Sequence, residues 1–437
     1  MNHDFFLSPE YPFVLRFAHQ HLSFRLPELF SLLELFEVSD LVKIPSDLSF
    51  LEYCPFLPIG GIPLDVLKQI VSRSILIRDL YQNYCYSSSV DDLIVDVEKS
   101  CTIREMLAPL STSSFKFTFD TFGSTLSAEQ QMAIINRFSF LPLKGPIKLQ
   151  DPDETFVVFG CLSSKTWNFD PEIWLFGRLM AQSSRYLVDV FDLKKRSYIG
   201  ITSMNAELSL IMSNMALIKK GSFFFDPFVG TGSFLLTGAY FGGLALGCDI
   251  DGRQIRGKGH SDIKSNARQY NVSSNILGAF ICDITRNPLR CDLEIFDAII
   301  TDPPYGVRAG AKKITPLSSL LVSKVADCMK PVYPKTAPYP TSQVYADLVD
   351  FSAVRLVVGG RVVFWIPSTD EDSSGAELDV PAHPCMKLVA KSEQKLNTWS
   401  RWLITMQKIA SPSSLPNPPA CEVEPRFFRT EYFRSPN

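Results

Sequence analysis

The stretch Phe223–Phe234 constrains the fold most strongly, because it reads as a strand, a glycine loop and the start of a helix. Three aromatic residues precede Asp226, which is typical of a strand buried on both faces. Gly230 and Gly232 then allow a tight loop, and Ser233 is predicted to cap the helix that follows. In α/β proteins such a unit holds a nucleotide-like ligand at the carboxyl edge of a parallel sheet.

The residues that follow the glycines narrow the choice of ligand. A phosphate-binding P-loop requires a lysine after its last glycine, but Ser233 stands there. A dinucleotide loop has a third glycine or alanine three residues after the second, where this chain has Leu235. The carboxylate of Asp226 beside two glycines fits a loop for S-adenosylmethionine, whose methionine portion is cationic. An ordinary tight turn remains the alternative.

The length and composition of the chain narrow the kinds of protein that it can be. A length of 437 residues predicts two or more domains, and a net charge of −3 means that any nucleic-acid binding must use local basic patches. No apolar run is long enough to span a membrane, and residues 1–4 lack the pattern of a signal peptide. The ten cysteines form no Cys-x-x-Cys pair, which indicates reduced thiols in an intracellular, cytoplasmic protein. With only five histidines, we expect no metal site.

The N-terminal part predicts an α+β region without a catalytic constellation. Residues Phe115–Phe122 alternate aromatic with polar residues, as in a half-buried strand. These aromatic side chains could stack on RNA bases, but the pattern favours a core role. Further strands are predicted at Phe13–Ala18 and Thr155–Phe159, and helices at Glu28–Phe36, Leu64–Ser72, Val90–Glu98 and from a capping box at Ser127–Gln130 to Arg137.

A connecting segment leads to the glycine loop. Its basic run, Lys194, Lys195 and Arg196, could meet a phosphate backbone or form a solvated turn, and charge alone does not separate the two. Ser203 is predicted to cap a helix that continues to Lys220.

Beyond the glycine loop, strands and helices alternate, which predicts a parallel sheet. Acidic residues follow three of the expected strands, and Asp249 is placed to accept both ribose hydroxyls of a nucleoside. Arg253–Arg268 reads as an exposed cationic helix. The strands are expected at Leu244–Cys248 before Asp249, Ala279–Cys282 before Asp283, Phe296–Thr301 before Asp302, and Arg361–Ile366.

The C-terminal part completes this domain. Residues 308–341 are expected to form a long loop, and a helix is expected over Val344–Val358. Two late strands, Met386–Val389 and Trp402–Met406, are expected to close the sheet as an antiparallel pair. Residues 410–437 are rich in Pro and Ser and are expected to be disordered.

The segment Asp302-Pro303-Pro304-Tyr305 points to the chemistry. The lone pair of an exocyclic amino group on a base is delocalised into the ring, so methylating it requires acceptors that hold both N–H groups. Asp302 and a backbone carbonyl near Pro303 supply such acceptors, and the two prolines hold that carbonyl rigidly. Tyr305 is expected to stack on the base. An ordinary Asp-Pro-Pro turn is the alternative, which the series of acidic strand ends disfavours.

Several motifs together resemble one family. The Asp-Pro-Pro-Tyr motif is shared with DNA amino-methyltransferases, but the whole set, from about residue 11 to 410, resembles the catalytic subunit of tRNA (guanine10-N2)-methyltransferase. The matching segments are His21–Glu28, Phe176–Arg178, Lys194–Arg196, Gly200–Met204, Asp226–Gly232, Asp249–Asp251, Asn266–Tyr270, Ile299–Gly306, Gly359–Arg361 and His383–Cys385.

The resemblance implies an architecture and partners. Residues 1–165 would form a ferredoxin-like and THUMP region that binds tRNA, 166–202 a connection, 203–410 a Rossmann-like methyltransferase domain, and 411–437 a tail. S-adenosylmethionine would be the methyl donor, and a small zinc-binding activator subunit the obligate partner. The basic segment between Asp251 and Asn266 is shorter than the family usually has, and Ser233 replaces a frequent glycine.

The resemblance also implies site residues. The catalytic residues would be Asp302, Pro303, Pro304 and Tyr305. The S-adenosylmethionine site would use Thr202, Met204, Asp226, Pro227, Phe228, Gly230, Gly232, Asp249 and Asp283, and RNA contacts would come from Lys194, Lys195, Arg196 and Arg308. A DNA amino-methyltransferase and a non-catalytic RNA-binding relative are the competing hypotheses.

Overall fold

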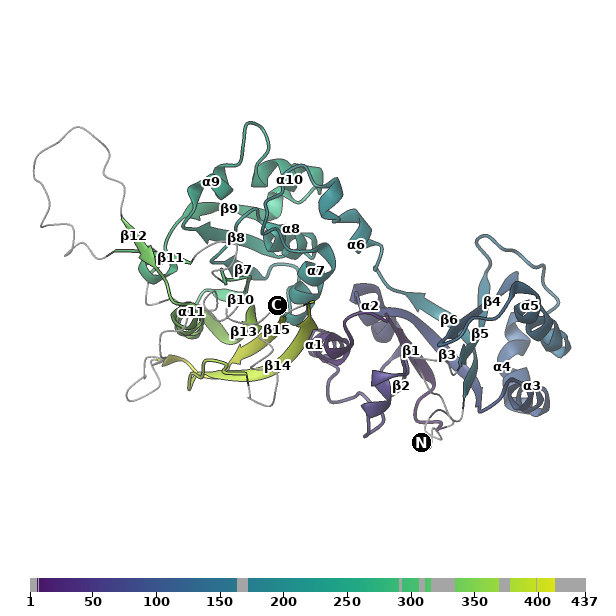
Figure 1. The fold of residues 1–437 in the computed structure, drawn as a ribbon. Coiled ribbons are helices and arrows are strands. Elements are labelled where there is room, and N and C mark those ends of the chain that lie inside the picture. The colour runs from purple at the N-terminus through teal and green to yellow at the C-terminus, as the bar shows by residue number, and fades with distance from the viewer. Residues whose placement is uncertain are drawn as a thin grey trace, which may run out of the picture. The chain divides into compact units, whose positions relative to one another are not determined.

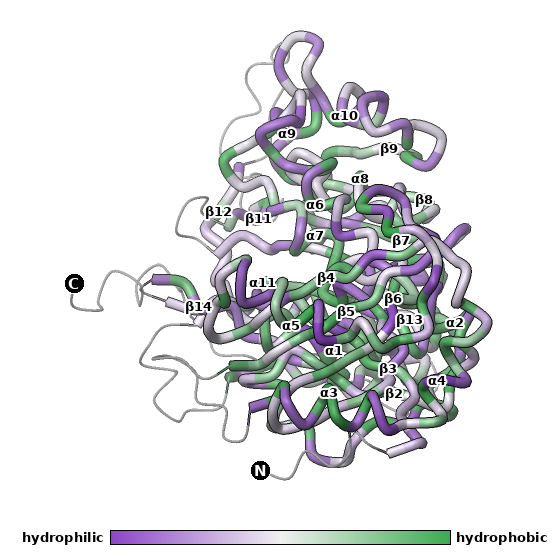
Figure 2. The backbone as a smooth tube through the Cα atoms, turned by 90° about the vertical axis from the view of Figure 1, so that its right-hand side faces the viewer, coloured by the Kyte–Doolittle hydropathy of each residue, from purple (hydrophilic) through white to green (hydrophobic). Residues whose placement is uncertain are grey.

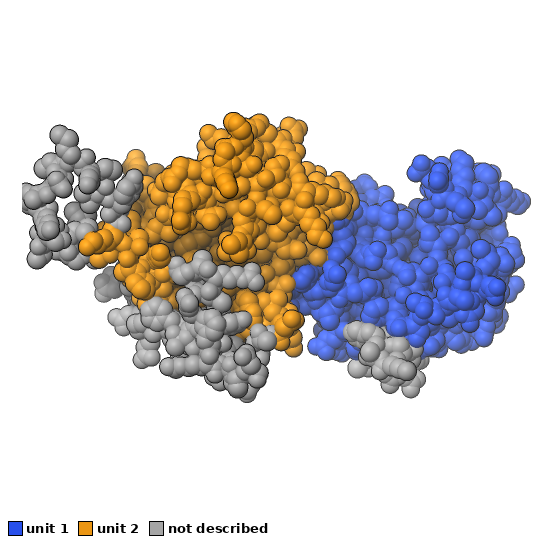
Figure 3. All heavy atoms as spheres, turned by 45° about the horizontal axis from the view of Figure 1, so that its top comes forward, with its two compact units in different colours: residues 1–25, 36–185 blue, residues 26–35, 186–437 orange. Residues whose placement is uncertain are grey.

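The chain forms two compact units (Figures 1 and 3). The computed structural model describes residues 6, 8–162, 172–290, 293–305, 311–315, 335–368, 378–397 and 399–412. Unit 1 comprises Met1–Arg25 and Phe36–Arg185, and unit 2 comprises Leu26–Leu35 and Tyr186–Asn437. Almost all of helix α1, Arg25–Leu35, therefore belongs to unit 2, although the chain on both sides of it builds unit 1.

Unit 1 is built on a six-stranded sheet with the order β2-β1-β3-β6-β5-β4. Only β4 and β5 run parallel to each other; the other neighbouring strands are antiparallel. The strands are β1 Phe13–Phe17, β2 Phe56–Ile59, β3 Ile77–Ser87, β4 Phe115–Phe122, β5 Glu154–Cys161 and β6 Ile173–Gln182. The strands predicted in this region are thus confirmed.

The helices of unit 1 also follow the sequence pattern. They are α2 Leu64–Arg73, α3 Val90–Lys99, α4 Cys101–Leu107 and α5 Ala128–Asn136. Ser127 and Gln130 form the predicted capping box at α5. Phe117 of β4 packs in a hydrophobic cluster, and its ring stacks on that of Phe176 with centroids 6.3 Å apart. The core interpretation of the β4 aromatic residues is therefore confirmed.

Unit 2 is built on a seven-stranded sheet with the order β14-β15-β13-β10-β7-β8-β9. Five neighbouring strands are parallel, and β15 and β14 close one side as the predicted antiparallel pair. The strands are β7 Phe223–Asp226, β8 Leu244–Asp249, β9 Ile276–Ile281, β10 Phe296–Thr301, β13 Leu356–Ser368, β14 Met386–Lys395 and β15 Ser400–Lys408. The Rossmann-like fold predicted for this half is confirmed.

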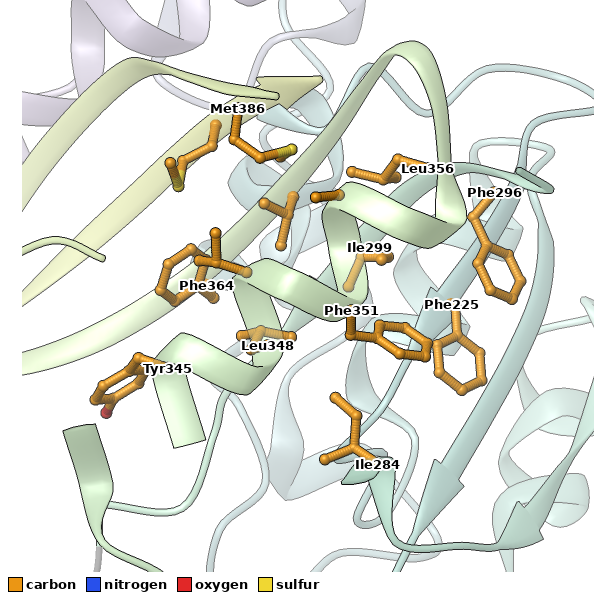
Figure 4. Packing of buried hydrophobic residues seen from close by; sticks show 14 of the residues in the cluster. Phe225, Ile284, Phe296, Ile299, Tyr345, Leu348, Phe351, Leu356, Phe364 and Met386 are labelled. Carbon is orange, nitrogen blue, oxygen red and sulfur yellow. The ribbon is translucent and has the colours of Figure 1, made fainter. Parts of the chain in front are cut away.

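Helices cover both faces of this sheet. Successive side chains of a strand point to opposite faces. Accordingly, Phe224 lies against α8, Ser233–Tyr240, where a Cβ on Gly238 would come within 2.4 Å of the Phe224 ring. Phe225 points to the other face, where its ring lies 5.8 Å from that of Phe351 in α11, Thr341–Arg355 (Figure 4). The aromatic run before the glycine loop is thus buried on both sides, as predicted.

Two predicted helix caps are wrong. Helix α7 spans Ala206–Met215 and is capped by Asn205, whose side chain accepts from two backbone N–H groups. The predicted cap, Ser203, instead accepts from Gly200 N at 2.8 Å. Helix α8 has Gly232 at the cap position with φ +82°, and Ser233 is its first helical residue. In the first place a residue two positions further on supplies the capping side chain, and in the second the glycine before the predicted serine occupies the cap position.

The predicted exposed helix over Arg253–Arg268 is two short helices. Helix α9 spans Gly252–Arg256, and α10 spans Ile263–Gln269. Gly257, with φ +68°, ends α9, because a residue in this backbone region does not continue a right-handed helix. Both helices carry mainly hydrophilic residues (Figure 2).

The remaining described segments are short. Within the predicted loop 308–341, β11 Lys312–Ile314 pairs antiparallel with β12 Thr336–Pro338, while 306–310 and 316–334 lie outside the described residues. The predicted disorder of the tail likewise falls largely outside them, from 413 onward. Helix α6 spans Leu187–Val190. None of the helices in the described ranges is long and apolar enough to cross a membrane.

Candidate active site

The order of the strands in unit 2 predicts a ligand crevice at the carboxyl ends of its parallel strands. From β7 the chain proceeds outward through β8 and β9, and it then returns to place β10 on the other side of β7. At such a reversal the loops after the two central strands diverge, which leaves room for a ligand. Asp226 ends β7, and Asp302 follows β10 directly. The two acidic residues singled out in the sequence therefore share this edge.

Asp226 lies at the end of β7, the strand at which the strand order reverses. Its side chain is buried, and its Oδ1 accepts hydrogen bonds from Thr301 Oγ1 at 2.7 Å and from Phe228 N at 3.1 Å. Its Oδ2 is buried without a hydrogen-bond partner. Burial raises the pKa of Asp226 to about 8. A cationic ligand group would satisfy the unpartnered oxygen, so the residues present fit the methionine end of S-adenosylmethionine.

The glycine loop brings its backbone to the same crevice. Gly230 has φ +49°, and Gly232 has φ +82°. A Cβ on Gly230 would meet no heavy atom of the chain closer than Phe228 O at 4.0 Å, so this side of the loop is open. Gly230 N donates to Asp249 Oδ2 at 2.9 Å, which ties the loop to the end of β8. The loop thus presents backbone to a ligand without side chains in between.

The next two acidic residues lie along the same edge. Asp249 Oδ1 accepts from Asp251 N at 2.8 Å, and burial raises the pKa of Asp249. Each carboxylate oxygen keeps a further lone pair for a ribose hydroxyl. Asp283 is buried; its Oδ1 accepts from Thr285 N at 2.9 Å, and its Oδ2 from Ile314 N at 2.6 Å. Asp283 therefore also anchors β11 beside the site.

Arg196 does not have the position expected of an RNA contact. It is buried, and its guanidinium donates to Thr231 O at 2.9 Å and to Ser233 Oγ at 2.9 Å. Its Nε donates to Tyr198 O at 3.1 Å. These bonds bind the connecting segment to the glycine loop, so Arg196 supports the cofactor loop instead of meeting a phosphate. The sequence could not distinguish these roles, because both use a cation.

The other basic residues predicted to contact RNA are two exposed lysines and Arg308. Lys194 and Lys195 are exposed, and Lys195 forms an ion pair with Asp189 at 2.6 Å. Arg308 lies outside the described residues. The sequence-predicted basic group is therefore not one patch: two of its members face solvent and one is internal.

The other residues predicted to bind the cofactor lie before and after β7. Thr202 is exposed, whereas Met204 is buried and donates its backbone N–H to Ser233 Oγ at 3.2 Å. Pro227 is buried in the turn after Asp226. Phe228 packs against a small cluster that joins Tyr339 and Val344.

The Asp-Pro-Pro-Tyr loop follows β10. Asp302 and Tyr305 are half-buried, and the Tyr305 hydroxyl donates to Asp302 Oδ1. Pro303 is buried and Pro304 is half-buried. Burial raises the pKa of Asp302, while a neighbouring arginine, Arg401, opposes that shift. Arg401 was not predicted as a site residue, because no motif surrounds it in its strand.

One expectation about the motif stays open. The stacking role expected of Tyr305 stays a prediction, because this structure holds no base. Among the described residues, no group of three or more His, Cys, Asp or Glu side chains could hold a metal ion.

The fold and the site together define a Rossmann-like, S-adenosylmethionine-dependent amino-methyltransferase with a separate N-terminal α+β unit. Residues 11–185 match the family model for the "Tmrp11 THUMP N-terminal domain", and residues 194–339 match "RMKL-like, methyltransferase domain". Curated relatives match most of the chain, and the chain belongs to the tRNA (guanine(10)-N(2))-methyltransferase family.

Three relatives illustrate this similarity. The tRNA (guanine(10)-N(2))-methyltransferase of Schizosaccharomyces pombe is 42% identical over 78% of this chain and 71% of its own length. The protein of that name from Saccharomyces cerevisiae is 34% identical over 90% of this chain and 92% of its own. The human relative is 33% identical over 91% and 88%, respectively.

Proposed function

We propose that this chain transfers a methyl group from S-adenosylmethionine to the exocyclic N2 of guanosine 10 in tRNA. The supporting observation is that Asp302 and a buried, unpartnered oxygen of Asp226 lie at the same edge of the sheet. One acidic residue is thus available to the cationic donor and the other to the amino group. The relatives named for this reaction specify the base and its position.

The chain's own residues would act by positioning. S-adenosylmethionine supplies a methyl group on a sulfonium and leaves as S-adenosylhomocysteine. Asp302 accepts one N–H of the guanine amino group, and a backbone carbonyl near Pro303 accepts the other. This favours a pyramidal nitrogen aligned with the methyl carbon. As the N–C bond forms, the nitrogen loses one proton, which Asp302 takes or passes to water.

The guanine must reach this crevice from within the RNA. A base in a stem has to be unstacked, at a cost of a few kcal/mol. When the base arrives, the Tyr305 hydroxyl can release Asp302 Oδ1 to the guanine amino group. Alternatively, it keeps this hydrogen bond, and Asp302 Oδ2 accepts from the amino group instead. The Tyr305 ring is the group that we expect to stack on the base. We assign tRNA binding to unit 1, which matches the THUMP model, with the exposed Lys194 as an additional phosphate contact.

The partner is the small zinc-binding activator subunit, and strand β9 is the proposed docking edge. Strand β9 ends the sheet and contains no charged residue. Leu277 is 54% and Ile281 56% exposed on it. The opposite edge strand, β14, carries several charged residues, which is how proteins protect an edge. An unprotected apolar edge suits a partner that adds a strand or covers it.

The cytoplasm is the proposed location. Cys54 and Cys161 lie within interaction distance as free thiols, and so do Cys248 and Cys282. Adjacent thiols that stay unbonded suit a reducing compartment.

The direct test measures nucleosides. Unmodified tRNA would be incubated with the chain, its activator and S-adenosylmethionine, and its nucleosides analysed by mass spectrometry. We expect N2-methylguanosine at position 10, and we expect Asp302→Ala to lower the rate at least 100-fold while S-adenosylmethionine binding by calorimetry is kept. Methylation of duplex DNA but not of tRNA would overturn the proposed substrate. An active Asp302→Ala variant would overturn the proposed catalytic residue.

A further inference from the structure

Arg401 of β15 is fixed in place by three neighbours. Its guanidinium lies over the ring of the fully buried Trp365, 4.1 Å from the centroid. Its Nε donates to Gln394 Oε1 at 2.7 Å, and its Nη2 lies 3.9 Å from Met204 Sδ. Only 15% of the Arg401 side chain is exposed. A stacked and hydrogen-bonded arginine of this kind has little freedom to turn away.

The Nη1 end of this guanidinium points to the loop that carries Asp302 and Tyr305. Nη1 of Arg401 lies 4.0 Å from Asp302 Oδ2 and 3.4 Å from the Tyr305 hydroxyl oxygen. The other titratable groups that act on Asp302 are Tyr305, the buried Tyr345 hydroxyl of α11, and Asp226 of β7. Two of these are neutral phenols and the third is an acid. Among these groups, Arg401 supplies the positive charge.

Arg401 lies too far from Asp302 for a direct hydrogen bond. A direct charge-assisted hydrogen bond measures roughly 2.7–2.9 Å, so at 4.0 Å Arg401 attracts the carboxylate without occupying its lone pairs. The Tyr305 hydroxyl already occupies Oδ1. Oδ2 therefore remains an acceptor for an incoming amino group. An arginine in direct contact would stabilise the anion equally well but would compete with the substrate.

We propose that Arg401 is a positioning residue that keeps Asp302 anionic and oriented toward the guanine amino group. This inference rests on the proposed function. Arg401 touches neither the methyl group nor the reacting nitrogen, and it acts through Asp302. Its contact with Met204 links the donor side of the site to the acceptor side. Loss of the cation leaves Asp302 desolvated near Asp226 and shifts it toward the protonated form, whose O–H donates and whose oxygens are weaker acceptors for an N–H.

The test compares pH profiles of single-turnover methyl transfer. Wild type, Arg401→Gln and Arg401→Lys are assayed between pH 6 and 8.5 with saturating tRNA, S-adenosylmethionine and activator. A cation at this distance shifts a carboxyl by roughly one unit or more, so the acid limb of Arg401→Gln moves to higher pH by at least about one unit. Its rate falls about tenfold or more at pH 6.5, and the loss shrinks as the pH rises. Arg401→Lys keeps the acid limb of wild type.

Controls separate this role from a structural one. Arg253→Gln removes an exposed arginine that pairs with Asp251, and it leaves the profile unchanged. S-adenosylmethionine affinity, measured by calorimetry, stays within about threefold of wild type in the Arg401 variants. A rate loss of equal size at every pH, or no loss, would overturn the inference. An Arg401→Lys variant whose acid limb moves by one pH unit would also overturn the inference. This second variant provides the test if Arg401→Gln does not fold. A wild-type chain that methylates no tRNA would overturn the proposed function itself.

Discussion

At the scale of single residues, Asp226 connects burial with ligand binding. Its pKa is raised to about 8 by burial, so the carboxyl is mostly protonated at pH 7 in the free chain. A cationic ligand beside the unpartnered Oδ2 favours the ionised form. Binding therefore releases a proton at neutral pH. The affinity for this ligand therefore rises with pH until Asp226 is already ionised in the free chain.

We expect the dissociation constant of S-adenosylmethionine to fall by up to about tenfold per pH unit between pH 6 and 7.5 and to level off near pH 8. Calorimetry in buffers of different ionisation enthalpy would detect the released proton. The control is Asp226→Asn, which should bind more weakly and lose this part of the dependence. An affinity that is flat over this range in wild type would contradict the prediction.

At the scale of elements, helix α1 is held in unit 2 by a buried arginine. Arg361 of β13 donates to Ser31 Oγ at 3.0 Å and to Met215 O at 2.9 Å, and it forms an ion pair with Glu34. The pair joins residues 327 positions apart in the sequence. Because Arg361 is buried, its partners lose their donor when it is removed, and such losses are costly.

We expect Arg361→Gln to lower the free energy of unfolding of unit 2 by about 2–4 kcal/mol. Thermal unfolding followed by circular dichroism would measure this. Arg253→Gln is the matched control, since its arginine is exposed and pairs with Asp251 at 2.8 Å on the surface. That variant should leave the free energy of unfolding unchanged, because solvent screens an exposed ion pair. Equal effects of the two substitutions would contradict the assigned role of Arg361.

Local patterns predicted the elements better than their ends. The strand before Asp226, the helix α8 and the antiparallel β14–β15 pair are dense in apolar residues and were found where the sequence predicted them. A cap depends on which side chain reaches the first backbone N–H groups of the helix, and Asn205 does so in place of the predicted Ser203. Likewise, Gly257 split a run of residues that looked helical.

In the candidate site, too, only the residues that belong to local patterns could be predicted. Asp226 and Asp302 follow strands and could be placed on one sheet edge from the sequence. Arg401 could not, because it reaches Asp302 from a strand about 100 residues later and carries no local motif. Arg196 was misplaced since burial cannot be read from charge. Tertiary contacts, not local patterns, decide these roles.

At the scale of the whole molecule, the two edges of the unit 2 sheet differ. Strand β9 is apolar and exposed, and β14 is charged. If the activator docks on β9, changing its exposed side chains should remove the partner without unfolding the chain.

We expect Leu277→Lys combined with Ile281→Lys to weaken activator binding at least tenfold and to lower tRNA methylation in parallel. Binding would be measured by calorimetry or by co-purification of the two chains. Leu388→Lys is the control on β14, where the leucine is 43% exposed, and it should bind the activator as wild type does. Unchanged binding by the β9 variant would place the partner elsewhere.

The position of α1 in unit 2 has a consequence for synthesis. The ribosome releases α1 early, but Glu34 cannot meet Arg361 until 327 further residues have been made. At roughly 5–20 residues per second, that takes on the order of 15–65 s. Unit 1 can complete its sheet during this interval, since its last strand ends at Gln182. Throughout it, the helix lacks its final partners, and its apolar residues stay uncovered by the rest of unit 2.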